Sequence, residues 1–304
     1  MSSSTTLRRP TNLEEYRKAG KGFATDEGWA RGLAFKPRPS DVFIATYAKA
    51  GMTWMQQIVH GLRTGGDMDF GEITEVVPWV EMAVDLGLDA EAEQAANPRA
   101  YKTHLNWTDV PKGGRYIAIV RHPYDIALSL FRFMDGWHFE SGSIPLDTFV
   151  REDFVSDEEG GGYWRHTLSW WQQRWRDDVL FLTYEGMKAD LPGTVRKVAA
   201  FIGIDPESKN VAIATQQASF DFMKAHAGQF DDNLVRRMRD AACGLPEGGE
   251  SNKVSSGASG GGRVALDADL RALLDAQWEA QIKPETGFAD YEAMQAALDE
   301  ERAA

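Results

Sequence analysis

The first residues with a chemical meaning form a short loop that contains a lysine and a glycine. Residues 46–54 read Thr-Tyr-Ala-Lys-Ala-Gly-Met-Thr-Trp, between an apolar run at 41–45 and a helix-like run at 55–62. A strand, a tight loop and a helix N-terminus form an anion-binding site, because backbone N–H groups and the positive end of the helix dipole point at the ligand. Lys49 adds a full positive charge. We expect this loop to hold a phosphate or a sulfate group.

The order of residues in this loop differs from that of the ATP-binding loop GxxxxGK[ST]. In that pattern the lysine follows the last glycine, and the next residue carries a hydroxyl for Mg²⁺. Here Lys49 comes before the only glycine of the loop, Gly51. The sequence therefore predicts an anion site that is not a Walker A site.

A second candidate anion site follows the apolar run 115–120. Arg121 ends that run, and Pro123 is expected to open a helix whose second turn carries Ser129. A guanidinium at such a position can make two parallel hydrogen bonds to a phosphate. A single arginine at a strand end is more often a surface or ion-pair residue, but its pairing with the first loop favours a ligand with two separated anionic groups.

His104 is the candidate general base. It closes the run Tyr101-Lys102-Thr103-His104, and a histidine near an anion site can take a proton at neutral pH. The alternative is a histidine that only makes structural hydrogen bonds. No spacing of histidine, cysteine and carboxylate residues indicates zinc, so no metal is expected. Three other histidines lack comparable neighbours: His138, His166 and His226.

The elements that must position these residues alternate between strand and helix. Strand-like runs lie at 41–45, 99–104, 115–121 and 179–184. Helix-like runs lie at 55–62, 123–133, 188–202 and 264–282. This order predicts an α/β fold in three layers, with a central parallel sheet of about four to five strands flanked by helices. Ligands of such sheets bind at the carboxyl ends of the strands. The candidate residues that follow strands are Lys49, His104, Arg121 and Tyr184.

Composition favours one globular domain over the whole chain, 1–304. Its 43% hydrophobic residues suffice for a core. Residues 1–38 are polar and read as a peripheral arm, and residues 244–262 are rich in glycine and serine and read as a flexible lid. Residues 264–304 read as a C-terminal helical segment.

The net charge and the cysteine content limit the classes of binding partner and the cellular compartment that are expected. The net charge of −13 argues against nucleic acid and against anionic membranes. A single cysteine, Cys243, allows no internal disulfide, which fits a reducing cytosol. No apolar run approaches about 18 residues, and the N-terminus lacks a signal-peptide pattern, so a cytoplasmic location is expected.

Five motifs, in order, resemble those of the soluble, cytosolic-type sulfotransferases. That family uses 3′-phosphoadenosine 5′-phosphosulfate (PAPS) as sulfuryl donor. Its motifs are Tyr-Pro-Lys-Ser-Gly-Thr-Thr-Trp, Lys-Thr-His, Arg-Asn-Pro-x-Asp-x-x-x-Ser, Tyr-Glu-x-Met-Lys and Ser-Phe-x-x-Met-Lys. The matching segments of this chain are 47–54, 102–104, 121–129, 184–188 and 219–224. Together the motifs cover about residues 40–265 and indicate a P-loop-like fold.

The resemblance implies in-line transfer of a sulfuryl group from PAPS to a hydroxyl of a small, hydrophobic acceptor, a phenol or an alcohol, without a metal. It implies that Lys49 stabilises the leaving oxygen, Lys102 bonds the sulfuryl group and His104 is the base. The implied PAPS-binding residues are Lys49, Ala50, Gly51, Met52, Thr53, Trp54, Arg121, Ser129, Tyr184, Ser219, Phe220, Gly257 and Arg263. The implied acceptor-binding residues are Trp79, Met82 and Phe139.

The chain departs from the family pattern at several positions. Ala48, Ala50 and Met52 replace a proline and two hydroxyl residues of the first loop. The family's Arg-Lys-Gly-x-x-Gly-x-Trp-Lys motif survives at 255–263 only as glycines and Arg263, without two cations that would hold the 3′-phosphate. The family's dimer motif is not found near 263–272, which leaves the oligomeric state open.

Two other functions stay possible at this stage. One is a nucleotide-dependent phosphotransferase on a related fold, which would need Mg²⁺ and ATP. The other is a catalytically impaired module that binds PAPS or its product 3′-phosphoadenosine 5′-phosphate (PAP), as the missing cations would suggest. Retention of Lys49 and His104 argues against the second, because binding alone needs no base. The sequence does not name the acceptor.

Overall fold

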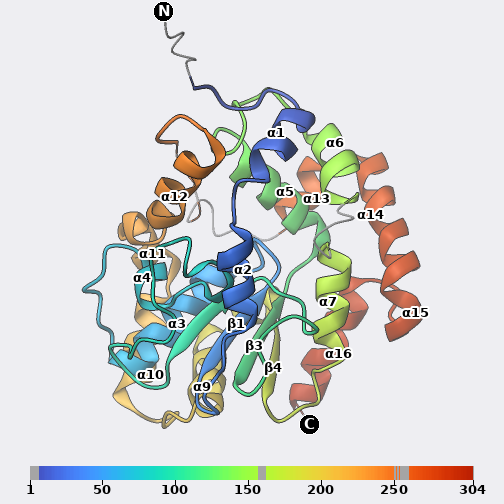
Figure 1. The fold of residues 1–304 in the computed structure, drawn as a ribbon. Helices are drawn as coiled ribbons and strands as arrows, with labels where there is room; N and C mark the ends of the chain where they lie inside the picture. Colours follow the sequence, from blue (N-terminus) through green and yellow to red (C-terminus); the bar gives the residue numbers. More distant parts are fainter. Residues whose placement is uncertain (1–6, 157–161, 250, 252, 254–259, 304) are drawn as a thin grey trace, which may run out of the picture.

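A four-stranded parallel sheet forms the centre of the protein in the computed structural model, which describes residues 7–156, 162–249, 251, 253 and 260–303 (Figure 1). The strand order is β2-β1-β3-β4. The strands are β1 (Val42–Thr46), β2 (Ala100–Thr103), β3 (Arg115–Val120) and β4 (Val179–Thr183). All three pairings are parallel, so the carboxyl ends of the strands meet at one edge. The predicted α/β fold with a parallel sheet is confirmed.

Helices cover both faces of the sheet (Figure 1). Alternate residues of a strand point to opposite faces, so Val42 and Ile44 enter one core and Phe43 and Ala45 the other. The first core packs on α3 (Met52–Thr64), α9 (Leu191–Phe201) and α10 (Lys209–Gln217). The second packs on α5 (Pro123–Met134), α7 (Tyr163–Trp171), α14 (Ala268–Gln281) and α16 (Tyr291–Ala303).

The described part of the N-terminal segment, residues 7–38, packs on the core through two short helices. It forms α1 (Leu13–Gly20) and α2 (Asp26–Leu33), and Leu13 joins the core. Tyr16 packs edge-to-face on Phe139 at 5.7 Å between ring centroids. Polar residues cover the outer faces of these short helices, which is why the segment reads as peripheral from composition alone.

The predicted helix at 188–202 is two helices. α8 (Tyr184–Ala189) ends before Asp190, whose carboxylate accepts a hydrogen bond of 2.8 Å from the backbone N–H of Gly193 and caps α9. Pro192 in the first turn of α9 fits this new start. The other described helical elements are α4 (Ile73–Val76), η1 (Val80–Met82), α6 (Leu146–Phe149), η2 (Val150–Phe154), α11 (Phe220–Ala225), η3 (Ala227–Gln229), α12 (Asn233–Cys243), α13 (Gly261–Ala265) and α15 (Lys283–Thr286).

The glycine-rich segment 244–262 lies partly outside the described residues, so its predicted role as a lid stays a prediction. Its last residues are anchored on α5. The Asp125 carboxylate accepts hydrogen bonds from the backbone N–H groups of Gly260 (2.7 Å) and Gly262 (2.8 Å). A Cβ at Gly262 would come within 2.4 Å of the Tyr124 carbonyl oxygen, so only glycine fits this close approach. Among the described helices, none is both long and apolar enough to cross a bilayer.

Candidate active site

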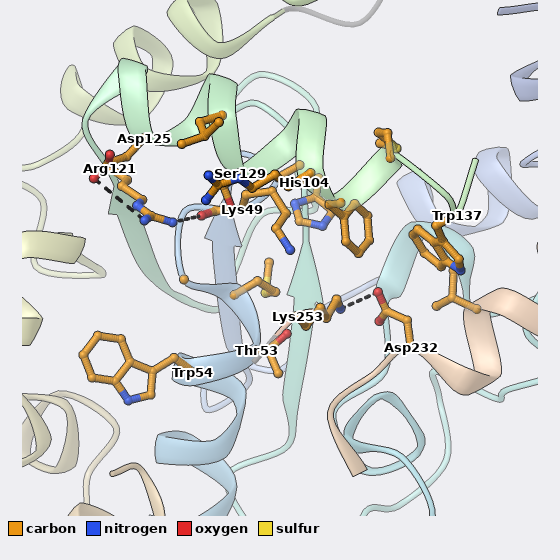
Figure 2. Close-up of a pocket in the computed structure, with 18 of the residues that line it drawn as sticks. Lys49, Thr53, Trp54, His104, Arg121, Asp125, Ser129, Trp137, Asp232 and Lys253 are labelled. Carbon is orange, nitrogen blue, oxygen red and sulfur yellow. Dashed lines mark hydrogen bonds and ion pairs between the residues drawn. The ribbon is translucent and has the colours of Figure 1, made fainter. Parts of the chain in front are cut away.

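A cavity of about 1450 Å³ opens at the carboxyl edge of the sheet (Figure 2). The loop after β1, the ends of β2 and β3, and α5 form its centre. Most of the predicted site residues line it: Lys49, Gly51, Met52, Thr53, Trp54, Trp79, Lys102, His104, Arg121, Ser129, Tyr184 and Phe220. The structure therefore brings two predicted anion sites and the candidate base into one space.

The loop after β1 has the geometry of an anion site. Gly51 is the N-cap of α3 in a left-handed conformation, with φ of 109°, and provides no side chain to cap the helix. A Cβ at Gly51 would approach the Tyr184 ring to 3.0 Å. The helix start is thus open to a ligand, as anion sites at helix N-termini require. Ala50 is fully buried, and its backbone N–H donates a hydrogen bond of 3.2 Å to the Tyr47 carbonyl oxygen, so its predicted contact with the ligand stays a prediction.

Lys49 extends from this loop over the ring of Phe133, with 4.0 Å between its ammonium and the ring centroid. Burial, followed by the charge of Lys253, lowers the pKa of Lys49 to about 7. A bound anion would favour the charged form of this lysine, since opposite charges raise the pKa of an amine.

Arg121 connects the two anion sites. Its guanidinium donates a hydrogen bond of 3.0 Å to the Lys49 carbonyl oxygen and lies over the Tyr184 ring at 4.2 Å. Its Nε atom has no partner among the residues that the structure describes. Ser129 lines the same cavity from α5. Both residues can therefore hold an anion beside the first loop.

His104 is held in the tautomer that a general base needs. Its Nδ1 lies 2.6 Å from the Thr46 carbonyl oxygen. A carbonyl only accepts, so Nδ1 carries the proton and Nε2 of the neutral ring is a free acceptor. Burial, followed by the charge of Lys102, lowers the pKa of His104 to about 4. The imidazole is thus neutral at pH 7, and the Trp79 ring fixes it edge-to-face at 5.0 Å.

Lys102 belongs to a buried charge cluster that the sequence does not reveal. Its ammonium lies over the Trp79 ring at 4.5 Å and 3.8 Å from Oδ1 of Asp232. The other carboxylate oxygen of Asp232 pairs with Lys253 (Figure 2). Neither Asp232 nor Lys253 lies in a recognisable motif. A carboxylate at the end of a loop and a lysine in a glycine-rich segment give no signal that they meet.

Aromatic rings at the other end of the cavity form a surface on which a flat ligand group can stack. Trp54 donates a hydrogen bond of 2.7 Å from its indole to the Ala218 carbonyl oxygen and packs edge-to-face on Tyr184. Phe220 is 39% exposed and lines the same cavity. Ser219 uses its hydroxyl to accept from the backbone N–H of Phe222 and so caps α11, which carries Phe220.

Among the predicted site residues that the structure describes, Met82, Phe139 and Arg263 lie away from this cavity, and Ala50 and Ser219 are not in its lining. Met82 and Phe139 are fully buried in the core, so neither can touch an acceptor without a rearrangement. Arg263 pairs with Glu292 beside a second cavity of about 710 Å³. Gly257 lies outside the described residues. The clamp role predicted for Arg263 stays a prediction.

The predicted Trp79 and several further residues build the apolar wall of the cavity. The wall residues include Tyr16, Phe23, Phe133, Met134, Trp137, His138 and Val235. The His138 ring packs against Trp137, with 4.5 Å between ring centroids, and burial lowers the pKa of His138 to about 3. It is a neutral part of this wall.

Comparison with known proteins identifies the family. The family model for the sulfotransferase domain matches residues 39–296. Sulfotransferase 1E1 of Cavia porcellus is 30% identical over 274 residues, which cover 85% of this chain and 88% of that protein. This chain belongs to the sulfotransferase family. Another relative, luciferin sulfotransferase of Photinus pyralis, is 30% identical over 239 residues, covering 67% of this chain and 62% of its own length.

Solved structures show the same fold in this sulfotransferase. Mouse sulfotransferase SULT7A1 complexed with PAP has a TM-score of 0.64 at 23% identity, covering 86% of this chain and 91% of that chain. Retinol dehydratase in complex with androsterone and inactive cofactor PAP has a TM-score of 0.65 at 20% identity, covering 91% and 95%. The predicted P-loop-like fold and the predicted enzyme class, a sulfotransferase, are confirmed.

Proposed function

We propose that this sulfotransferase moves a sulfuryl group from PAPS to a hydroxyl of a small hydrophobic acceptor, with His104 as the general base. The observation that carries the proposal is the tautomer of His104. Its Nδ1 is bound to the Thr46 carbonyl oxygen at 2.6 Å, so Nε2 accepts, and this ring lines the same cavity as the anion loop. A binding module would need no such base.

The charge of the cavity supports PAPS as the donor. The whole chain has a net charge of −13, yet seven lysines and arginines and only three aspartates line the cavity. This surplus of positively charged side chains suits a ligand with several anionic groups. Residues 49–54 would hold the 5′-phosphosulfate, Arg121 and Ser129 the 3′-phosphate, and Trp54 and Phe220 the adenine. PAPS supplies the activated sulfuryl group.

The apolar wall supports a hydrophobic acceptor. Rings of Tyr16, Phe23, Trp79 and Trp137 line the part of the cavity beyond His104. The related retinol dehydratase was solved with androsterone and with retinol, and both are hydrophobic alcohols. Acceptors of this kind place an apolar body on the wall and a hydroxyl at the polar centre.

The residues of this chain then have separate roles in the transfer. His104 accepts the proton of the acceptor hydroxyl, which makes the oxygen a stronger nucleophile. Lys49 and Lys102 place positive charge where negative charge develops during transfer, and the cavity holds donor and acceptor in line. The chain's own groups suffice for these roles. The absence of a metal requirement stays a prediction.

A transfer assay tests the proposal. The purified protein is incubated with radiolabelled PAPS and a panel of phenols, sterols, long-chain alcohols and one polysaccharide, with and without EDTA. We expect labelled product from at least one hydrophobic hydroxyl compound. The His104→Ala variant should have a kcat lower by a factor of about 10²–10⁴. The control is His226→Ala, because the His226 ring stacks on Phe222 outside the cavity, and this variant should keep the wild-type kcat. Phosphoryl transfer from ATP with no transfer from PAPS would support the phosphotransferase instead.

A further inference from the structure

Asp232 and Lys253 lie at the centre of the cavity without a role in the reaction described so far. We infer that Asp232 is a positioning residue that holds Lys253 beside Lys102, and that Lys253 is a third lysine acting on the transferred sulfuryl group. This inference rests on the proposed function.

One carboxylate joins two ammonium groups, and a third ammonium lies near them against a shared ring. Asp232 pairs with Lys253 through Oδ2 (Figure 2). Its other oxygen, Oδ1, lies 3.8 Å from the Lys102 ammonium. The Lys253 ammonium is 5.9 Å from the centroid of the Phe133 ring, over which the Lys49 ammonium lies at 4.0 Å. All four charged side chains line the cavity. Lys253 is thus within reach of the same ligand group as the two predicted catalytic lysines.

The backbone conformation of Asp232 indicates that this residue serves the cavity. Asp232 has φ of 59°, and among the described residues the only other non-glycine residue with positive φ is Lys49. A left-handed conformation costs free energy for a residue with a Cβ, and such strain gathers at functional sites. Both strained residues of the described chain therefore belong to one centre.

The segment that carries Lys253 is seated at two points. The Ser251 hydroxyl donates a hydrogen bond of 2.7 Å to the Asp231 carbonyl oxygen, and Lys253 pairs with the next residue, Asp232. The side chains of Asp232 and Lys253 are only 6% and 12% exposed. Asp231 and Asp232 thus fix where this segment enters the cavity.

The carboxylate also opposes the loss of charge at Lys102. Burial lowers the pKa of Lys102, and the charge of Asp232 opposes that shift. Oδ1 of Asp232 has no hydrogen-bond partner among the described residues, so the carboxylate is not saturated by Lys253. An ion pair that served only stability would be expected to satisfy both oxygens, because an unsatisfied buried carboxylate oxygen is costly.

Two substitutions test the inference in the full chain. Lys253→Met removes the charge at similar length. Asp232→Asn removes the carboxylate charge but keeps a residue that tolerates a left-handed backbone. Lys283→Met is the control, because Lys283 pairs with Glu279 on the surface. Each variant is measured for kcat and KM with PAPS, for PAP affinity by calorimetry and for thermal stability.

We expect kcat to fall about 10²-fold for Lys253→Met, the scale of one lost electrostatic contact to a developing charge. Asp232→Asn should lower kcat about tenfold and leave PAP affinity equal or tighter, because one negative charge leaves a cationic cavity. In the Lys253→Met background the effect of Asp232→Asn should be smaller, as expected for residues that act together.

The results that would contradict the inference differ from those that would contradict the proposed function. If Lys253→Met keeps wild-type kcat, Lys253 takes no part in transfer and the inference is wrong. A lower melting temperature with unchanged kcat in both variants would make the pair purely structural. If Asp232→Asn fails to fold, Lys253→Met alone decides. A wild-type protein that binds PAP but transfers nothing would contradict the proposed function, not this inference.

Discussion

At the scale of single residues, the site depends on side chains whose charge states differ from those of free amino acids. His104 is neutral because its environment is dry and cationic, and Lys49 has a pKa of about 7 for a similar reason. A neutral imidazole can accept a proton, and a charged ammonium can stabilise an anion. The two groups are therefore in their useful states together only between their two pKa values.

This pairing predicts the pH dependence of kcat/KM for PAPS. Lys49 is charged below its pKa, so kcat/KM should fall as pH rises through about 7. His104 accepts a proton only above its pKa, so a second fall should come as pH drops toward about 4. The profile of kcat/KM reports the free enzyme, whose pKa values these are. A flat profile from neutral to alkaline pH would contradict the assignment to Lys49.

Substitution of Lys49 tests how much its positive charge contributes to kcat. Lys49→Ala should lower kcat about 10²-fold. Lys49→Arg should not restore it, since a planar guanidinium cannot replace a compact ammonium over the Phe133 ring. Full activity of the arginine variant would show that only diffuse charge matters there.

At the scale of elements, the junction of α5 and α13 links the predicted 3′-phosphate site to the C-terminal helices. Arg121 precedes α5, Asp125 lies in its first turn, and Asp125 caps the backbone that leads into α13. The carboxylate of Asp125 is also 3.9 Å from the Arg121 guanidinium. One aspartate therefore holds both an anion-site residue and the end of the glycine-rich segment.

Glycine substitution tests this junction. Gly262→Ala should destabilise the fold by about 1–3 kcal/mol, because its Cβ would clash with the Tyr124 backbone. Gly228→Ala is the matched control, since a methyl group at that position would have no other atom within 4 Å. Denaturant unfolding measures both. Equal stability of the two variants would mean that α13 shifts freely on α5.

At the scale of the whole molecule, a cationic cavity lies in an acidic protein. The net charge of −13 repels anions at a distance, while the cavity attracts them locally. Recognition therefore depends on close contacts with each anionic group of the ligand. The second anion site, with Arg121 and Ser129, should discriminate nucleotides by their 3′-phosphate.

Thermal shift with nucleotides measures this discrimination. PAP should raise the melting temperature more than AMP or ATP at equal concentration, because a ligand of the folded state stabilises it in proportion to its affinity. The Arg121→Met variant should respond to PAP and AMP more nearly alike. If AMP and PAP give equal shifts in the wild type, Arg121 and Ser129 do not form a phosphate site.

The sequence by itself determined the α/β class, the loop that carries Lys49, and the strand ends that carry His104 and Arg121. These features are local, because a strand, a turn and a helix start are set by neighbouring residues, and parallel strands must end at one edge. The break at Asp190 is also local, because Asp190 and Pro192 are signals of a helix start that the prediction of one helix over 188–202 did not use.

Only the tertiary structure decided which distant segments complete the cavity. Helix α1 and Phe23 line the cavity from the N-terminal segment. Arg263 pairs with Glu292, and Met82 and Phe139 are buried in the core. Asp232 and Lys253 meet Lys102 from segments far away in the chain. Such contacts depend on the path of loops and on which side chains fill the core. No periodicity or motif around a single residue encodes either of these.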